Sequence, residues 1–211
     1  MIIRGSHKSK AVDQSRGHAD CWRVLQPGAT PEAYRLVLTC CGANNIAVVD
    51  GNGAAQWELS GEHFESVKVG KILPDVPGLQ ILVDIDHRPP GESPIWVLDA
   101  EGNQRGSLMS DYCRHHTLVD WTGDGVMEFV VGQAQGVFDR SGKRIATLQG
   151  LRDAVDGETL VLPGDMTGDG VPDITLAVPS SPCRLYVFKN EKGTKSSGAA
   201  VLGCGVNFTL Y

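Results

Sequence analysis

The sequence lacks the features that would place the protein across a membrane or on a nucleic acid. No apolar stretch approaches the roughly 20 residues that a membrane-spanning helix needs, so we expect no membrane span. Basic residues are outnumbered, with 19 Lys and Arg against 25 Asp and Glu, and the acids are spread along the chain. The resulting net charge of −6 argues against a nucleic-acid partner and says little about a sugar partner.

Paired metal-binding cysteines and an export signal are also missing. No CxxC pair occurs, so the sequence predicts neither a zinc ribbon nor a thioredoxin-like site, and we expect buried strand thiols. The cysteines are Cys21, Cys40, Cys41, Cys113, Cys183 and Cys204. Residues 1–16 are polar and basic without a following apolar stretch. Any signal that sends the parent protein to an extracellular or periplasmic location would therefore lie upstream of Met1.

What the chain does contain is a hairpin motif in four copies. Three are clear, VVDGNGAAQWEL from Val48, VLDAEGNQRGSL from Val97 and VFDRSGKRIATL from Val137, and a weaker one, VFKNEKG, begins at Val187. In each clear copy an Asp precedes two turn residues and a Gly. Asp accepts hydrogen bonds from the turn backbone and Gly tolerates positive φ, so the motif predicts a tight hairpin. The period of roughly 40 to 50 residues is typical of propeller blades or of helical repeats.

The segments between the hairpins decide between these two architectures. They are short β-branched runs such as ILVDI, EFVVG and DITLAVP, which exclude helical repeats and predict an all-β chain. Each unit also begins with a further apolar strand, at Cys21, Phe64, His116 and Thr159. Four strands per unit make one blade of a β-propeller, which buries its faces only against neighbouring blades.

We therefore predict an all-β fold, a β-propeller with four four-stranded blades. The expected blades cover about residues 17–62, 63–114, 115–157 and 158–211. Because propellers usually hold about 4 to 8 blades, we expect these four to belong to a ring of about 7 to 8. Residues 1–16 are then disordered or the remnant of a preceding blade of an N-terminally truncated chain. Missing N-terminal blades or a partner chain would complete the ring, and the C-terminal GCGVNFTLY is expected to add a closing strand.

Two acidic turns carry the sharpest chemical signal, DWTGDGVME from Asp120 and DMTGDGVPD from Asp165. Each has side-chain oxygens at positions one, three, five and nine and a Gly at position six. Ca²⁺ takes about six to eight hard oxygen ligands, and the spacing matches the first half of an EF-hand loop. The expected ligands are Asp120, Thr122, Asp124, the Val126 carbonyl and Glu128, then Asp165, Thr167, Asp169, the Val171 carbonyl and Asp173.

The alternative for these turns is an acid-rich turn without a metal, because Asp and Gly are good turn formers in any case. If calcium binds, we expect it to brace a blade rather than to take part in chemistry. The corresponding segments of the first two units, from Leu25 and from Ile72, lack the set of acids. Calcium is therefore expected only in the last two units.

Histidines recur near the start of the first strand in three units. First strands line the central channel of a propeller, so these histidines are predicted to converge and to face a common ligand. Acids follow two residues later in two units and an Arg precedes the third, which suits a metal or an anionic sugar. The residues are His18, Asp20, His63, Glu65, Arg114, His115 and His116. The alternative is that they cap strand ends, and we interpret His87 and Arg88 as surface-loop residues.

The acidic turns resemble the DxxGDGxx(D/E) loops of FG-GAP or VCBS propeller repeats, except that position three is Thr. More narrowly, GHADCWRV and EHFESVKVGKILPDVPGLQILV resemble blades of rhamnogalacturonan lyases and related propeller polysaccharide lyases. In those blades a His-x-acid element opens a strand and a PDxPGLE-type turn follows. The resemblance covers Gly17 to about Phe188. Ala19 and Phe64 depart from the family's Gly, and Lys71 and Leu73 replace expected acids.

The resemblance implies a secreted, calcium-binding propeller that cleaves a uronate-containing, rhamnogalacturonan-like polysaccharide by β-elimination. It implies His63 and His116 as base or metal contacts, and Arg114 as the group that binds the uronate charge. Substrate contacts would come from His18, Asp20, Glu65 and His115. Two alternatives stay open: a non-catalytic FG-GAP module that binds glycans or proteins, and a purely structural segment of a ring.

Overall fold

The computed structural model describes residues 19–151, 159–179 and 181–195, which form strands and two single-turn 3-10 helices but no α-helix. The predicted all-β class is confirmed. The first two sheets contain β1 (Cys21–Gln26), β2 (Arg35–Cys40), β3 (Asn45–Val49), β4 (Ala55–Ser60), β5 (Phe64–Gly70), β6 (Gln80–Ile85), β7 (Ser93–Leu98) and β8 (Gln104–Ser110). The other two contain β9 (His116–Val119), β10 (Glu128–Val131), β11 (Gly136–Phe138), β12 (Arg144–Thr147), β13 (Leu160–Gly164), β14 (Asp173–Val178) and β15 (Arg184–Phe188).

Every sheet is an antiparallel meander in which strands that are consecutive in sequence are hydrogen-bonded neighbours. Three sheets have four strands, and the fourth sheet has three, β13 to β15, within the described residues. The closing strand expected at the C-terminus and the proposed blade remnant at residues 1–16 lie outside the described residues. The 3-10 helices η2 (Pro31–Ala33) and η3 (Cys41–Ala43) both belong to loops of the first sheet.

The predicted hairpin turns form in all three clear copies. Asp50 Oδ1 accepts the amides of Asn52 and Ala54 at 2.8 and 2.9 Å. Asp99 and Asp139 accept the amides two and four residues further on in the same way. The Gly of each turn has a φ between 80° and 85°, a conformation that costs side-chain-bearing residues energy. The repeated sequence therefore encodes a repeated local structure.

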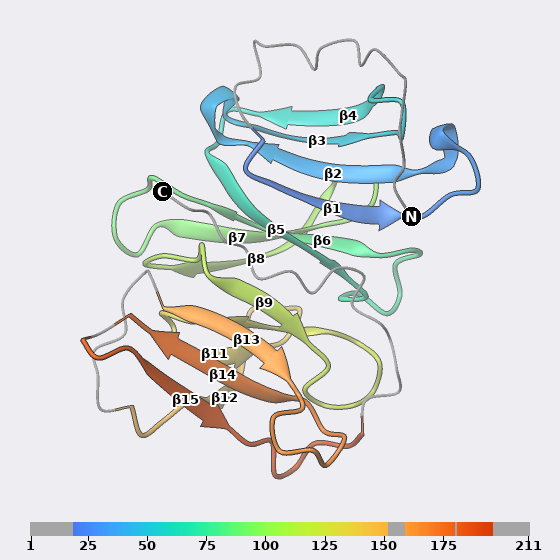
Figure 1. The fold of residues 1–211 in the computed structure, drawn as a ribbon. Helices are drawn as coiled ribbons and strands as arrows, with labels where there is room; N and C mark the ends of the chain where they lie inside the picture. The colour runs from blue at the N-terminus through green and yellow to red at the C-terminus, as the bar shows by residue number, and fades with distance from the viewer. Residues whose placement is uncertain (1–18, 152–158, 180, 196–211) are drawn as a thin grey trace.

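The four sheets follow one another as successive layers (Figure 1), each first strand contacting the first strand of the next sheet. A separate apolar core fills each of the three spaces between neighbouring sheets. Alternate residues of one strand serve different cores: Ile81 and Val83 of β6 face the first sheet, and Leu82 faces the third. This period-two pattern buries both faces of the inner strands. In the outermost strands β4, β8 and β12, successive side chains instead alternate between exposed and half-buried.

The cysteine prediction is correct in part. Cys21 and Cys40 are buried in strands as expected. Cys113 is buried but lies in the loop before β9, Cys41 is half-buried in η3 and Cys183 is exposed, so the expectation of buried strand thiols is wrong for these three. Cys41 lies outside the strands because the chain turns over the end of the first sheet there. Cys204 lies outside the described residues. Within the described part of the chain, no helix has the length and apolar character needed to cross a membrane.

Candidate functional site

Glu65 is the centre of a polar cluster at the start of β5. The strand opens with an irregular register between Phe64 and Val67, and the carboxyl of Glu65 is almost fully buried. Its Oε2 lies 3.2 Å from Nε2 of His63, and its Oε1 lies 2.8 Å from a guanidinium nitrogen of Arg114. Burial raises the pKa of Glu65 and the charge of Asp20 adds to this, although Arg114 and His63 oppose it.

The first sheet contributes the other side of this cluster. The backbone amide of Cys41, at the start of η3, donates to Oδ2 of Asp20 at 2.6 Å. The ligand atoms of Cys41, His63 and Glu65 all lie within 4.8 Å of one another. Burial, with Asp20 next in importance, raises the pKa of the Cys41 thiol to about 12. We call Asp20, Cys41, His63, Glu65 and Arg114 the Glu65 cluster.

Further polar side chains surround the Glu65 cluster. Nδ1 of His63 lies 3.3 Å from Oδ1 of Asn44, and the ring of His87 meets the His63 ring edge-on with centroids 4.2 Å apart. Arg114 donates to the hydroxyl of Tyr112 at 3.4 Å. The side chains of His63 and Arg114 are 24% and 18% exposed, so a ligand can reach them from solvent.

Four of the seven residues predicted to converge do so, namely Asp20, His63, Glu65 and Arg114. His116 is buried, and its Nδ1 donates to the carbonyl of Cys113 at 2.7 Å. Burial lowers the pKa of His116 to about 3, with Lys68 adding to the effect, so the side chain is neutral and removed from solvent. This geometry favours a structural part for His116.

Two further predicted residues, His115 and His18, are not among the members of the Glu65 cluster, and four residues in or beside the cluster were not predicted to contribute. His115 is half-buried beside His116, and its backbone carbonyl accepts the amide of Gly132. His18 lies outside the described residues. No spacing rule pointed to Cys41, Asn44 or Tyr112, which reach the cluster from loops. His87 was read as an ordinary loop residue, although the loop after β6 carries its ring to His63.

The two acidic turns share several of their internal hydrogen bonds. The carboxylate at position one accepts the amide of the Gly at position six, from Gly125 to Asp120 at 3.3 Å and from Gly170 to Asp165 at 2.8 Å. The Asp at position five accepts the amide two residues on, at 2.8 and 2.9 Å. The duplication seen in the sequence is therefore a duplication of three-dimensional structure.

Position nine closes each turn in the same manner. Glu128 Oε2 accepts the amides of Trp121 and Thr122, and its Oε1 accepts the hydroxyl of Thr122 at 3.1 Å. Asp173 Oδ2 accepts the two corresponding amides, both at 3.0 Å. Burial raises the pKa of Glu128, and the bonds from the turn oppose this rise. The position-nine acids thus hold the turns closed by direct contact with the backbone.

The oxygen donors of these turns suit Ca²⁺, but the carboxylates are not drawn around one point. Among the described residues, neither set of three acids brings one oxygen from each within 4.8 Å of the others. Calcium binds oxygen at about 2.3–2.6 Å, so coordination needs the side chains to rotate inward. The backbone already has the required bends, because both glycines of each turn have φ between 77° and 85°. The donor set therefore fits calcium after side-chain movement.

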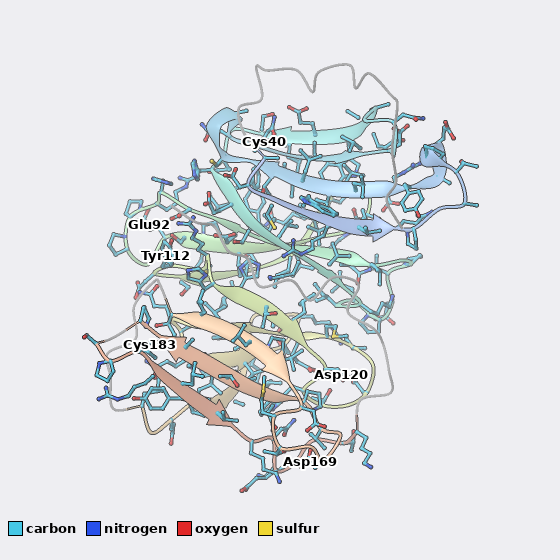
Figure 2. The ribbon with its side chains drawn as sticks, viewed as in Figure 1. Cys40, Glu92, Tyr112, Asp120, Asp169 and Cys183 are labelled. Carbon is cyan, nitrogen blue, oxygen red and sulfur yellow. The ribbon has the colours of Figure 1, made fainter. Side chains whose placement is uncertain are left out.

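The segment after β15 joins the two acidic turns. The side-chain amide of Asn190 donates to the carbonyl of Trp121 at 2.7 Å, and its backbone amide donates to Oδ1 of Asp173 at 3.1 Å. Thr194 adds a bond to the carbonyl of Thr122 at 3.2 Å. Figure 2 places Asp120 and Asp169 toward the end of the inner strands opposite Cys40 and Tyr112. The acidic turns and the Glu65 cluster therefore lie at different ends of the sheets.

Comparisons with known proteins bear on the fold alone. No protein-family model and no curated protein matches the chain. Among solved structures it resembles the V. cholerae biofilm matrix protein Bap1, with 15% identity, a TM-score of 0.56 and 82% of this chain covered. A Bacteroides caccae protein of unknown function (15% identity, TM-score 0.45, 82% of this chain and 59% of that chain) and BBS1N in complex with ARL6DN (12%, 0.43, 83% and 66%) are weaker matches. The chain spans 27% of the length of Bap1.

Proposed function

We propose that this chain is a calcium-binding β-propeller of the FG-GAP or VCBS class that acts as a polysaccharide lyase on uronate-containing, rhamnogalacturonan-like chains. One observation carries the enzymatic part: the side chains of His63, Glu65 and Arg114 contact one another at the start of β5. A partner polysaccharide of this kind implies an extracellular or periplasmic location, which belongs to the same proposal.

The propeller arrangement is supported by how the sheets contact one another. An apolar core fills the space between each sheet and the next, as between the blades around a propeller axis. Trp22 in β1 and Leu185 and Val187 in β15 are 62%, 67% and 52% exposed, whereas the third strands β7 and β11 are buried or half-buried. Large exposed apolar side chains on the two outermost sheets suit further blades on either side.

Calcium is proposed to brace the last two sheets. The first turn would hold it with Asp120, Thr122, Asp124, the Val126 carbonyl and Glu128, and the second with the matching set from Asp165 to Asp173. A bound ion supplies positive charge that gathers the carboxylates, which stabilises the turns and the segment that Asn190 ties to them. Calcium takes no part in the proposed bond cleavage.

The Glu65 cluster offers the three groups that β-elimination from a uronate requires. Arg114 pairs with the uronate carboxylate and so makes the proton at C5 more acidic. His63 removes that proton, and the electron pair forms the C4=C5 double bond while the C4–O bond to the leaving sugar breaks. Tyr112, next to Arg114, supplies the proton to the leaving oxygen. His63 then returns its proton to solvent and the Tyr112 phenolate takes a proton from solvent, which restores both groups.

One observation favours a second candidate function, a non-catalytic module that binds acidic glycans or proteins. Glu65 engages both His63 and Arg114, and Asn44 engages the other nitrogen of His63. A substrate must displace at least one of these contacts before His63 can serve as a base. A binding site needs only the accessible edge of Arg114 and His63.

Turnover separates the two candidates. A panel of uronate polymers with calcium is assayed for the ultraviolet absorbance of unsaturated product, and binding is measured by calorimetry. The lyase proposal expects turnover that falls at least about 100-fold in His63→Gln and Arg114→Lys. The matched control is Arg105→Lys, which alters an ion pair with Asp99 in a distant hairpin. Binding without turnover supports the module, and silence in both assays refutes both candidates.

A further inference from the structure

Two neighbouring sheets bring three metal-ligating side chains of different chemistry together. Cys41 comes from η3 of the first sheet, His63 precedes β5 and Glu65 lies within it. Their ligand atoms lie within 4.8 Å of one another, and Nε2 of His63 is already 3.2 Å from Oε2 of Glu65. Among the described residues, this is the only group of three or more His, Cys, Asp or Glu side chains with that property.

The contacts of His63 point to a cation between His63 and Glu65. Nδ1 faces Oδ1 of Asn44 and Nε2 faces a carboxylate oxygen of Glu65, and both of these oxygens are acceptors. A neutral imidazole carries one N–H, so it satisfies one acceptor and turns a lone pair toward the other. Either a second proton on the ring or a metal ion on Nε2 removes this conflict. With the metal, Nδ1–H donates to Asn44 and fixes the ring, as the outer partners of metal-bound histidines do.

We propose that Cys41, His63 and Glu65 form a binding site for a transition-metal ion of the zinc type. Thiolate, imidazole and carboxylate are ligands that Zn²⁺ combines readily, whereas Ca²⁺ requires oxygen. Zinc binding would displace the proton of the Cys41 thiol, which leaves to solvent. Oε2 of Glu65 faces the ion while Oε1 keeps its contact with Arg114. Three protein ligands leave a fourth position for water, and the ion joins the first sheet to the second.

Zinc ligation needs only a modest contraction of the cluster. Zinc binds nitrogen and oxygen at about 2.0–2.2 Å and sulfur at about 2.3 Å, so its ligand atoms lie roughly 3.5 Å apart. The His63–Glu65 pair is already close to this separation, and Cys41 is the side chain that has to approach. The charge of Arg114 beside Glu65 opposes a cation, whereas the negative charges of Asp20 and Asp86 favour one. The partial exposure of His63 gives the ion a route from solvent.

The test of this site does not depend on lyase activity, because metal binding is measured without turnover. A zinc ion on Nε2 of His63 would occupy the nitrogen lone pair that the lyase proposal uses as its base, so the metal would inhibit that reaction. Zn²⁺ is titrated calorimetrically into the full chain with Ca²⁺ present, so that the acidic turns are occupied. Co²⁺ is used in parallel, since thiolate ligation gives it a characteristic charge-transfer absorption. We expect one zinc ion per chain and a thiolate band with Co²⁺. Cys41→Ser and His63→Gln should each weaken zinc binding at least about tenfold and Cys41→Ser should abolish the band.

Two control variants locate the metal. Cys183→Ser removes an exposed thiol next to β15, and Asp139→Asn alters a hairpin turn of the third sheet, and both should leave zinc affinity unchanged. Should Cys41→Ser fail to fold, zinc protection of Cys41 against alkylation is measured on the unaltered chain by mass spectrometry. Absent zinc binding, unchanged affinity in a folded Cys41→Ser, loss of binding in either control, or unprotected Cys41 would each overturn the proposal.

Discussion

Replacing Asp84 by Asn should change how the stability of the protein depends on pH. Asp84 lies in β6 with no exposed surface, and its Oδ1 accepts the amide of Ser66 at 2.7 Å. Burial raises its pKa from the ordinary 3.8 to about 8, and the charges of Asp86 and Glu65 add to the rise. Asn keeps the size and the acceptor while removing the titration.

The sign follows from proton binding. Between pH 3.8 and about 8 the folded state holds a proton on Asp84 that the unfolded state has lost, so stability falls as pH rises through this window. Each pH unit is worth about 1.4 kcal/mol, and the three units from pH 5 to 8 amount to about 4 kcal/mol. The free energy of unfolding of Asp84→Asn, relative to the unaltered protein, should rise by about that amount between pH 5 and pH 9.

Urea unfolding at several pH values measures this difference. Asp139→Asn is the matched control. Burial raises the pKa of Asp139, but the hydrogen bonds from Ser141 and Lys143 together outweigh burial, so the pKa is lowered. The effect of Asp139 on the pH dependence of stability is therefore confined to acid pH. Above pH 5, the stability profile of Asp139→Asn should run parallel to that of the unaltered protein. Parallel profiles for Asp84→Asn over the same range would refute the assignment of a protonated Asp84.

Four further outcomes are expected. His116→Gln should remove a loss of stability that develops as pH falls from 6.5 toward 3, because the folded state keeps His116 neutral with a pKa of about 3; urea unfolding checks this. In thermal melts, Gly123→Ala should destabilise the protein by at least about 2 kcal/mol, and by more than Gly168→Ala does. Both glycines have φ of 77°, but only at Gly123 would the added Cβ meet Thr194. Asn190→Ala should cost about 1–2 kcal/mol in the same melts through an unpaired Trp121 carbonyl. Chelation should remove about 2.7 kcal/mol of stability for each occupied turn if calcium was at 100 times its Kd, and so should lower the melting temperature; an unchanged melt would indicate turns without metal.

Local chemistry made much of this fold predictable. The Asp and Gly of each hairpin act within five residues of one another, so the turns at Asp50, Asp99 and Asp139 follow from sequence alone. The acidic turns are local in the same sense, and their closure by the position-nine acid repeats in both. The sequence does not predict whether these turns bind metal, because hydrogen bonds to backbone amides and coordination of calcium use the same oxygens.

Contacts between sheets were harder to predict, because they depend on how far one layer covers the next. His115 occupies the repeat position of His63, because the carbonyls of both accept the amide that follows the next strand, from Gly132 and Asp86. His116 takes the position of Phe64, the buried first residue of β5, so a histidine stands where the repeat places an apolar core residue. Cys41 and Asn190 likewise act across loops that no periodic pattern describes. A repeat fixes the register of a residue along its strand, but the neighbouring sheet determines its environment.

The His-x-acid element has a geometric explanation that needs no family resemblance. Side chains two residues apart lie on the same face of an extended chain, so His63 and Glu65 point together while Phe64 between them enters the apolar core. The irregular register of β5 leaves the amide of Ser66 to Asp84, which anchors the strand directly after Glu65. A protonated Asp84 can take this amide without adding charge beneath Glu65. The buried Asp84 thereby positions the cluster, and the negative charge of Glu65 stays available to His63, Arg114 and any bound cation.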